Sequence, residues 1–245
     1  MEVDLRDSNS VVALRDAGKR FGSRSVLAGV TAGVAPGEVV GVIGPNGGGK
    51  STLLLLMAGL LKPSSGSVTV CGVAAHRLAL ESAGLVGLVM ARPGLYPLLN
   101  GWENLEYFGG LFDLSPQATR EKSAAMLDAF ALSGQMETRL STWSTGMQQK
   151  LSLVRALLLS PKLLLFDEPA ANLDPHAAKT LYEEVRRRAD DGLACVLVTH
   201  NLPAAEAICD RVWLVSGGIR REIVPDAKRP VPSGPLLDAW TQELR

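Results

Sequence analysis

The sequence contains few cysteines and few aromatic residues, and it carries no net charge. Its 245 residues include three cysteines, 5% aromatic residues, and 25 basic against 25 acidic side chains. Cys71, Cys195 and Cys209 are odd in number and widely spaced, which predicts ordinary thiols in a reducing compartment rather than a disulfide framework or a metal motif. A neutral chain has no overall basic field that attracts nucleic acid. We therefore expect no nucleic-acid partner.

Long hydrophobic runs are also missing. The longest apolar stretch, around Leu53–Leu61, is far shorter than the roughly 20 residues that a membrane-spanning helix needs. The opening residues, MEVDLRDSNS, are charged and contain no apolar core of a signal peptide. We expect any role at a membrane to require a separate partner.

Residues 44–52 read GPNGGGKST and match the pattern G-x-x-x-x-G-K-[ST] in full. A short β-branched run precedes this loop and a leucine-rich run follows it, which predicts a strand, a loop and a helix. Such a loop directs backbone N–H groups at an anion, and the first turn of the helix adds more of them. The motif predicts a nucleoside triphosphate site formed by Gly44, Pro45, Asn46, Gly47, Gly48, Gly49, Lys50, Ser51 and Thr52.

Within this loop, two side chains have distinct expected roles. Lys50 brings a cation to the β- and γ-phosphates, and the Ser51 hydroxyl is suited to binding Mg²⁺. A second acidic element supports this interpretation, since the apolar run Leu163–Phe166 ends in Asp167 and Glu168. We expect Asp167 to hold Mg²⁺ and Glu168 to polarise the attacking water. An acidic turn after a strand is common by itself, so this signal depends on the phosphate loop.

The stretch WSTGMQQK at residues 143–150 and the following LSLVRALLLSPKLLLFDEPAANLDP resemble the signature helix, acidic strand end and D-loop of the ABC-transporter ATPases. These motif sequences are most similar to those of the ABC-2-type exporter ATPases, and the resemblance extends from Phe21 to about Gly218. The resemblance implies a P-loop α/β core with an N-terminal antiparallel β portion and an inserted helical subdomain. It also implies that ATP and Mg²⁺ are bound and that ATP is hydrolysed.

The same resemblance implies roles for residues outside the phosphate loop. Phe21 would stack on adenine, although a lone phenylalanine before glycine more often serves packing. Ser144 and Gly146 would contact the γ-phosphate held by a second copy of the chain. Asp174 belongs to the D-loop at residues 172–174, and His200 would contact the γ-phosphate and join Glu168 as a catalytic residue.

Other prominent residues carry structural expectations. Trp143 is large enough to pack against the helical insertion instead of touching nucleotide. His76 and His176 lack a supporting motif and are expected at the surface. The charged runs Glu183–Arg188 and Arg220–Glu222 are expected to be solvated faces.

We expect one domain over residues 1–245. Residues from about 1–90 and 161–223 would form the catalytic core with its β portion, and about 91–160 the helical insertion with the signature helix. Residues from about 224–245 would form a C-terminal tail, in which Leu236, Leu237 and Trp240 could line one apolar helix face.

One position departs from the family pattern, because Ala91 stands where the Q-loop glutamine is expected. The first glutamine of the chain is Gln117, and a methyl group neither binds Mg²⁺ nor hydrogen-bonds water. We expect hydrolysis to persist through Glu168 and His200, with altered coupling to a partner. Ala91→Gln should therefore change partner-stimulated ATPase activity, and unchanged stimulation would count against this view.

Two functions compete. The first is the ATPase subunit of an exporter at the cytoplasmic face of the inner or plasma membrane. It would work as a head-to-tail dimer that drives separate transmembrane permease subunits, docked near Pro93–Trp102. The alternative is a soluble ABC ATPase in iron–sulfur assembly, which the length of the chain permits. The two differ in whether the partner is a membrane protein or a soluble scaffold.

Overall fold

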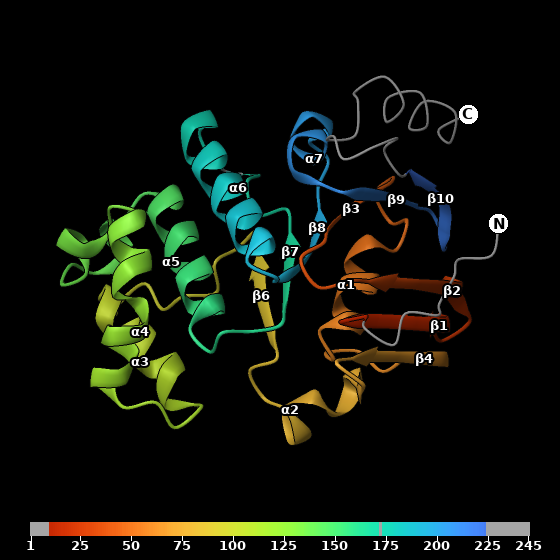
Figure 1. Ribbon diagram of the computed structural model, residues 1–245, viewed down its shortest axis with the longest axis horizontal. Helices are drawn as coiled ribbons and strands as arrows, with labels where there is room; N and C mark the ends of the chain where they lie inside the picture. Colours follow the sequence, from red (N-terminus) through yellow and green to blue (C-terminus); the bar gives the residue numbers. More distant parts are fainter. Residues whose placement is uncertain (1–9, 172, 224–245) are drawn as a thin grey trace.

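The computed structural model describes residues 10–171 and 173–223, folded as two β-sheets with helices between and around them (Figure 1). The strands are β1 (Val12–Phe21), β2 (Arg24–Val34), β3 (Val39–Ile43), β4 (Ser65–Val70), β5 (Val73–Ala74), β6 (Val86–Met90), β7 (Leu163–Asp167), β8 (Ala194–Val198), β9 (Arg211–Val215) and β10 (Ile219–Ile223). The helices are α1 (Lys50–Met57), α2 (Leu78–Glu81), α3 (Gly101–Gly110), α4 (Pro116–Ala129), α5 (Thr145–Leu157), α6 (Pro175–Asp190) and α7 (Leu202–Ile208). Short 3₁₀ turns occur at Ala75–Arg77, Ser133–Gln135 and Leu140–Thr142.

The two sheets differ in direction. The larger has the order β10-β9-β3-β8-β7-β6, and its strands pair in parallel except for β10. The smaller is antiparallel, with the order β2-β1-β4-β5. A parallel sheet buried by helices favours continuous apolar strands, which β3, β7 and β8 provide. The expected P-loop α/β fold with an antiparallel β portion is confirmed.

Alternate residues of the central strands pack into two separate cores. Leu163 and Leu165 on β7 join the cluster that contains the apolar residues of α1 and of the antiparallel sheet. Leu164 and Phe166 point the other way, toward α5, α6 and α7. This alternation follows from the two-residue repeat of a strand. It places α1, and the phosphate loop before it, between the two sheets.

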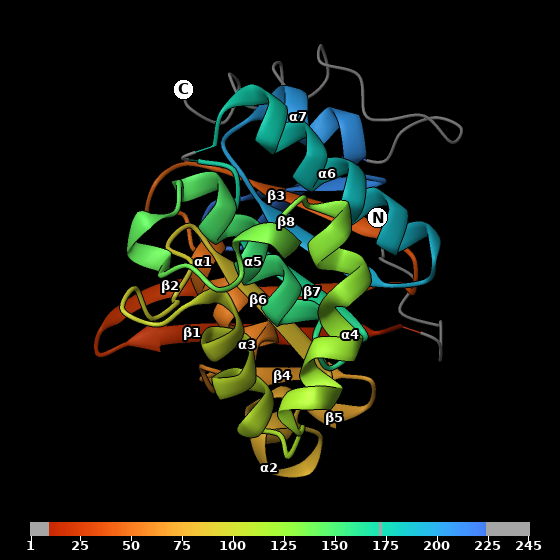
Figure 2. The ribbon, with the colours of Figure 1, turned by 90° about the vertical axis from the view of Figure 1, so that its left-hand side faces the viewer.

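The helical portion lies to one side of the large sheet and contains α3, α4 and α5 (Figure 2). Each of these helices begins at a capping residue: Asn100 forms a capping box with Glu103, and Ser115 and Ser144 each accept a hydrogen bond from the first turn of α4 and α5. Trp143 is 5% exposed and packs in this portion. Its indole N–H donates to Thr138 Oγ1 at 2.8 Å. The expectation that Trp143 is a packing residue is confirmed.

Several sequence expectations need correction. Neither α7 nor β10 is anticipated by the sequence patterns. In the run Arg220–Glu222, the solvated-face prediction is wrong for Glu222, which accepts hydrogen bonds from Arg211 at 3.0 Å and from the Trp213 indole at 2.7 Å. The predicted tail at 224–245 and Asn172 of the D-loop lie outside the described residues. Within the described ranges, no helix is long and apolar enough to cross a membrane.

Candidate nucleotide site

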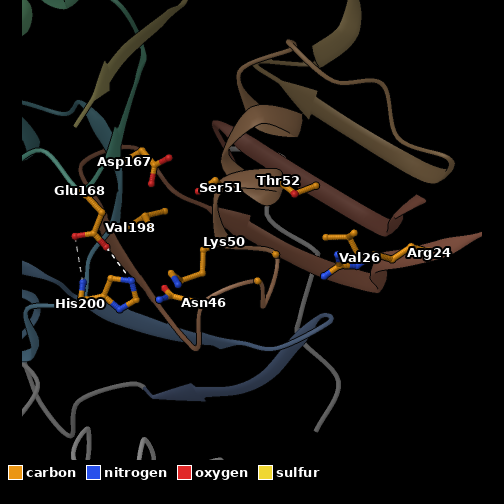
Figure 3. A pocket seen from close by; sticks show the side chains of 12 residues that line it. Arg24, Val26, Asn46, Lys50, Ser51, Thr52, Asp167, Glu168, Val198 and His200 are labelled. Carbon is orange, nitrogen blue, oxygen red and sulfur yellow. Dashed lines mark hydrogen bonds and ion pairs between the residues drawn. The ribbon is translucent and has the colours of Figure 1, made fainter. Parts of the chain in front are cut away.

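A pocket of about 330 Å³ opens at the carboxyl ends of β3, β7 and β8, beside the start of α1 (Figure 3). These strands are parallel neighbours in the sheet, so their ends meet at the same edge. Ligands of open α/β sheets bind at this edge. The pocket is lined by Arg24, Val26, Asn46, Gly47, Gly49, Lys50, Ser51, Thr52, Asp167, Glu168, Val198 and His200.

The loop that forms the pocket floor depends on two glycines. Gly44 has φ +152°, and a Cβ there would lie 2.1 Å from the Val215 carbonyl oxygen. Gly49 has φ +103°, and its Cβ would lie 2.7 Å from Leu27 Cδ2. A side chain at either position meets both backbone strain and a steric clash. The glycines of the motif therefore serve the loop conformation and its close packing against the neighbouring strands.

Lys50 crosses back over the loop that precedes it. Its ammonium donates to the carbonyl oxygens of Gly44 at 2.9 Å and Pro45 at 3.0 Å, and the residue is only 7% exposed. Burial lowers the pKa of Lys50, and the nearby carboxylates Glu168 and Asp167 oppose that shift. A buried ammonium bound to two neutral carbonyls retains a strong preference for an anion. The residues present thus fit a phosphate group.

Glu168 and His200 lie next to each other on one side of the pocket (Figure 3). The His200 backbone N–H donates to Glu168 Oε2 at 3.4 Å, and His200 Nε2 lies 3.5 Å from Glu168 Oε1. Glu168 has φ +51°, a region that non-glycine residues seldom adopt and that is often found at functional sites. Burial raises the pKa of Glu168, while His200 opposes the shift. A carboxylate with a raised pKa suits a general base.

Ser51 and Asp167 also line the pocket, as expected for Mg²⁺ ligands. In the described part of the chain, no group of three or more His, Cys, Asp or Glu side chains is placed to hold a metal ion. This donor set fits Mg²⁺ bound with a nucleotide, because Mg²⁺ keeps several waters and takes one or two protein ligands plus phosphate oxygens. The role of each residue toward Mg²⁺ stays a prediction.

The structure does not bring every predicted residue into this pocket. Ser144 and Gly146 lie at the start of α5 and do not line it. Asp174 caps α6, where its carboxylate accepts from the backbone N–H groups of His176 at 3.0 Å and Ala177 at 2.9 Å. These hydrogen bonds, led by that from Ala177, lower the pKa of Asp174. Asp174 has a structural role in the single chain, and its role toward nucleotide stays a prediction.

Phe21 lies at the end of β1, is 49% exposed and does not line the pocket. Lys19 Nζ is 5.1 Å from the centre of its ring. An exposed ring that contacts a cation has an open face available for stacking. Adenine stacking on Phe21 stays a prediction. His76 and His176 are both exposed, which confirms that expectation.

Three lining residues were not anticipated from the sequence. Arg24 and Val26 stand two apart on β2 and therefore face the same side of that strand, while Val198 ends β8. A possible signal is the position of Arg24 and Val26, shortly after Phe21 at the start of a β-prone run. These positions match no sequence motif. Only the packing of the two sheets places β2 beside the phosphate loop.

Arg24 gives a testable expectation for nucleotide affinity. Its guanidinium lies 3.9 Å from the position of a Cβ on Gly47, at the pocket mouth. Arg24→Ala should weaken ATP binding up to about tenfold, because an exposed cation near phosphate contributes modestly. The loss should shrink at high ionic strength. Titration with a fluorescent ATP analogue at two salt concentrations measures it. Arg20→Ala is the matched control, since Arg20 is bonded to the Ser23 carbonyl.

The raised pKa of Glu168 predicts a pH-dependent stability difference. A carboxyl group whose pKa is higher in the folded than in the unfolded state destabilises the fold as the pH rises from the unfolded pKa to the folded pKa. Above the folded pKa the full destabilisation remains. Glu168→Gln should therefore have a higher Tm than the wild type at pH 7. The difference should vanish below the ordinary glutamate pKa of about 4.3. Calorimetry from pH 4 to 8 tests this; a less stable variant at pH 7 would contradict it.

Comparison with known proteins agrees with this geometry. The profile of the ABC transporter family matches residues 27–171. The uncharacterized ABC transporter ATP-binding protein YdbJ of Bacillus subtilis is 35% identical over 228 residues, which cover 92% of this chain and 73% of that protein. The Nod factor export ATP-binding protein I of Rhizobium etli is 33% identical, with 88% of this chain and 68% of that protein covered.

Solved structures show the same fold. The ATP-binding subunit of an ABC transporter superposes with a TM-score of 0.81 at 29% identity, covering 89% of this chain and 91% of that one. A dimeric ATP-binding cassette in a post-hydrolysis state with ADP and Pi superposes with a TM-score of 0.79 at 26% identity, covering 89% and 100%. With the phosphate loop, the acidic strand end and His200 assembled at one sheet edge, this chain belongs to the ABC transporter family as an ATP-binding protein.

Proposed function

We propose that this chain hydrolyses ATP in a head-to-tail dimer of two copies and thereby drives export through separate membrane subunits. The observation that carries the proposal is that the residues expected to contact phosphate lie at two separate places on the chain. Lys50, Asp167, Glu168 and His200 share one pocket, whereas Ser144 lies outside it at the exposed N-terminus of α5. A helix N-terminus that faces solvent is available to the anion held by another copy.

The chemistry assigned to the pocket follows from its residues. Lys50 and the loop N–H groups hold the β- and γ-phosphates and stabilise the charge that develops on them. Ser51 and Asp167 would hold Mg²⁺, which would neutralise charge on the phosphate oxygens. Glu168 accepts the proton of the attacking water, and His200 keeps that carboxylate in position while contacting the γ-phosphate. The two contacts between Glu168 and His200, at 3.4 and 3.5 Å, support this pairing.

Names of relatives support export as the coupled process. One relative is described as a Nod factor export protein, and the linearmycin resistance ATP-binding protein LnrL of Bacillus subtilis is 29% identical. Dimeric cassettes among the solved structures support pairing of two copies. No observation favours the iron–sulfur alternative. We place the chain at the cytoplasmic face of the inner or plasma membrane, bound through its permease.

We assign docking of the permease to an aromatic and aliphatic surface on α3 and on the segments directly before and after it. Tyr96, Tyr107 and Phe112 are each more than 40% exposed, and Leu98 and Leu111 more than 60%. The Tyr96 and Tyr107 rings meet edge to face at 5.0 Å, so the surface is preformed. Only part of the expected region Pro93–Trp102 is exposed, since Trp102 packs against the core. An apolar helix of a membrane subunit fits such a patch.

Purification of the tagged full-length chain from native membranes tests the proposal. We expect a multi-span membrane protein to co-purify and to raise the ATPase rate after reconstitution into lipid vesicles. A Tyr107→Glu variant should lose this partner while keeping its basal ATPase activity. A stable complex with a soluble scaffold, and no membrane protein, would overturn the assignment to export.

A further inference from the structure

The last residue of β6 and the segment that follows it are hydrogen-bonded to the signature helix α5 at three backbone carbonyls. The bonds run from Gln149 Nε2 to the Met90 oxygen at 3.0 Å, from Ser152 Oγ to the Pro93 oxygen at 3.1 Å, and from Arg155 Nη1 to the Gly94 oxygen at 2.8 Å. The donors stand three residues apart, on successive turns of α5. Gln149 and Ser152 are buried, at 1% and 0% exposed. The contact is therefore a continuous seam that is buried at Gln149 and Ser152 and reaches the surface at Arg155.

Arg155 extends this seam to α3. Its guanidinium lies 4.7 Å from the centre of the Phe108 ring, and that ring stacks on Tyr96 at 5.9 Å. Burial lowers the pKa of Arg155. In the part of the chain that the structure describes, its hydrogen bonds go to the neutral acceptors Gly94 and Ser152. A half-buried cation without a carboxylate is a poor source of stability. Its placement is better explained by a role in positioning the segment.

Helix α5 contacts proposed functional groups at its N-terminus and along its length. At its N-terminus, Ser144 is the residue expected to contact the nucleotide of a second copy. Further along, Gln149 holds Met90, which is the register partner of Asp167 on the neighbouring strand. A 13-residue α-helix moves as one body about 20 Å long. A displacement at Ser144 is thus transmitted to the carbonyls that α5 holds.

We propose that Arg155, supported by Gln149 and Ser152, is the positioning residue that carries the state of the signature helix to the segment at 91–98, in place of a Q-loop glutamine. The inference rests on the proposed function and deepens it. Ala91 offers no polar group to the nucleotide site, so the α5 seam supplies the link between that site and the permease surface. Closure of the dimer on ATP then orders residues 91–98 through these three hydrogen bonds.

Hydrogen–deuterium exchange on the full-length chain tests the proposal. The Glu168→Gln variant is the parent, because it retains ATP. With Mg²⁺ and ATP, we expect slower exchange at 44–52, at 144–147, and about tenfold slower exchange at 91–98. Adding Arg155→Met should leave the protection of 44–52 and 144–147 unchanged and reduce the protection of 91–98 to less than twofold. A hydrogen bond to a charged group slows the opening of a segment by roughly tenfold or more. Methionine preserves contact with Phe108, so the fold and its Tm are retained.

Two variants separate positioning from packing. Arg120→Met is the matched control: Arg120 stacks on Trp102 at 4.8 Å but is paired with Glu106, and its loss should leave 91–98 unchanged. Ser152→Ala removes the bond to the Pro93 carbonyl and the one that Ser152 accepts from Arg155, but it leaves the bond from Arg155 to Gly94, so it should give an intermediate effect at 91–98.

Three results would overturn the inference. The first is that residues 91–98 keep their full ATP-dependent protection in Arg155→Met. The second is that Arg120→Met loses this protection to the same extent, which would indicate a general packing effect. The third is a parent in which 44–52 is protected but 144–147 is not. That last result refutes the composite dimer site itself and is thereby distinguished from failure of the seam alone.

Discussion

Glu168→Gln is expected to lower kcat for ATP hydrolysis by about 10²–10⁴-fold, the usual contribution of a general base. The carboxylate lines the phosphate pocket beside His200, and burial raises its pKa toward the range in which a base works well. Glutamine keeps the size and can still accept the His200 backbone N–H, but it cannot take a proton from water. Removal of a negative charge near the phosphates should also strengthen ATP binding.

Steady-state ATPase assays and equilibrium binding of ATP separate the two effects. ATP should convert the variant to a lasting dimer, which light scattering detects. Glu183→Gln provides the control, because Glu183 is exposed on α6 with a weak pair to Lys179 at 3.8 Å. Retention of more than about one tenth of the wild-type kcat by Glu168→Gln would show that another group acts as the base.

Mixing two inactive variants is expected to restore ATPase activity. Lys50→Met removes the phosphate-binding cation from its own chain. Ser144→Asp keeps a good helix cap on α5 but places a negative charge where the second copy would present its γ-phosphate. Each variant alone should lose about 100-fold or more in kcat/KM. In a mixed dimer, the intact Lys50 of one chain faces the intact Ser144 of the other, so one of the two sites is complete.

At equal amounts, the mixture should reach up to roughly a quarter of the wild-type rate, since half of the dimers are mixed and each has one complete site. Activity is measured against the total chain concentration. Ser115→Asp makes the same cap exchange on α4 and should be fully active alone. If the mixture stays as inactive as its components, the site is not shared between copies.

Motifs within short segments were predictable because local backbone geometry suffices for them. The loop around Gly44 and Lys50 and the strand ending in Asp167 both follow from residues close together in sequence. The fold class followed from the family resemblance, whereas the order of the strands is known only from the structure. Element α7, which begins after Asn201, was missed because it has 7 residues and a mixed composition.

Charged runs were harder to interpret. Arg186 lies in a run predicted to be solvated, yet it bonds to the Gly37 carbonyl at 3.1 Å and to Asp210 at 2.9 Å. Its partners are 149 and 24 residues away in sequence. Periodicity indicates which face of a helix is polar, but it does not indicate which distant backbone oxygen that face meets.

By itself, the sequence determined that this protein binds a nucleoside triphosphate and belongs among the ABC ATPases, because contiguous motifs encode the phosphate loop and the acidic strand end. Only the tertiary structure decided what else meets those motifs. The order of the large sheet brings His200 to Glu168. The packing of the two sheets places Arg24 at the pocket mouth, and the packing of α5 on the segment after β6 seats Arg155 on the Gly94 carbonyl 61 residues away. Such contacts depend on how strands and helices pack across the chain, and local sequence carries no record of that packing.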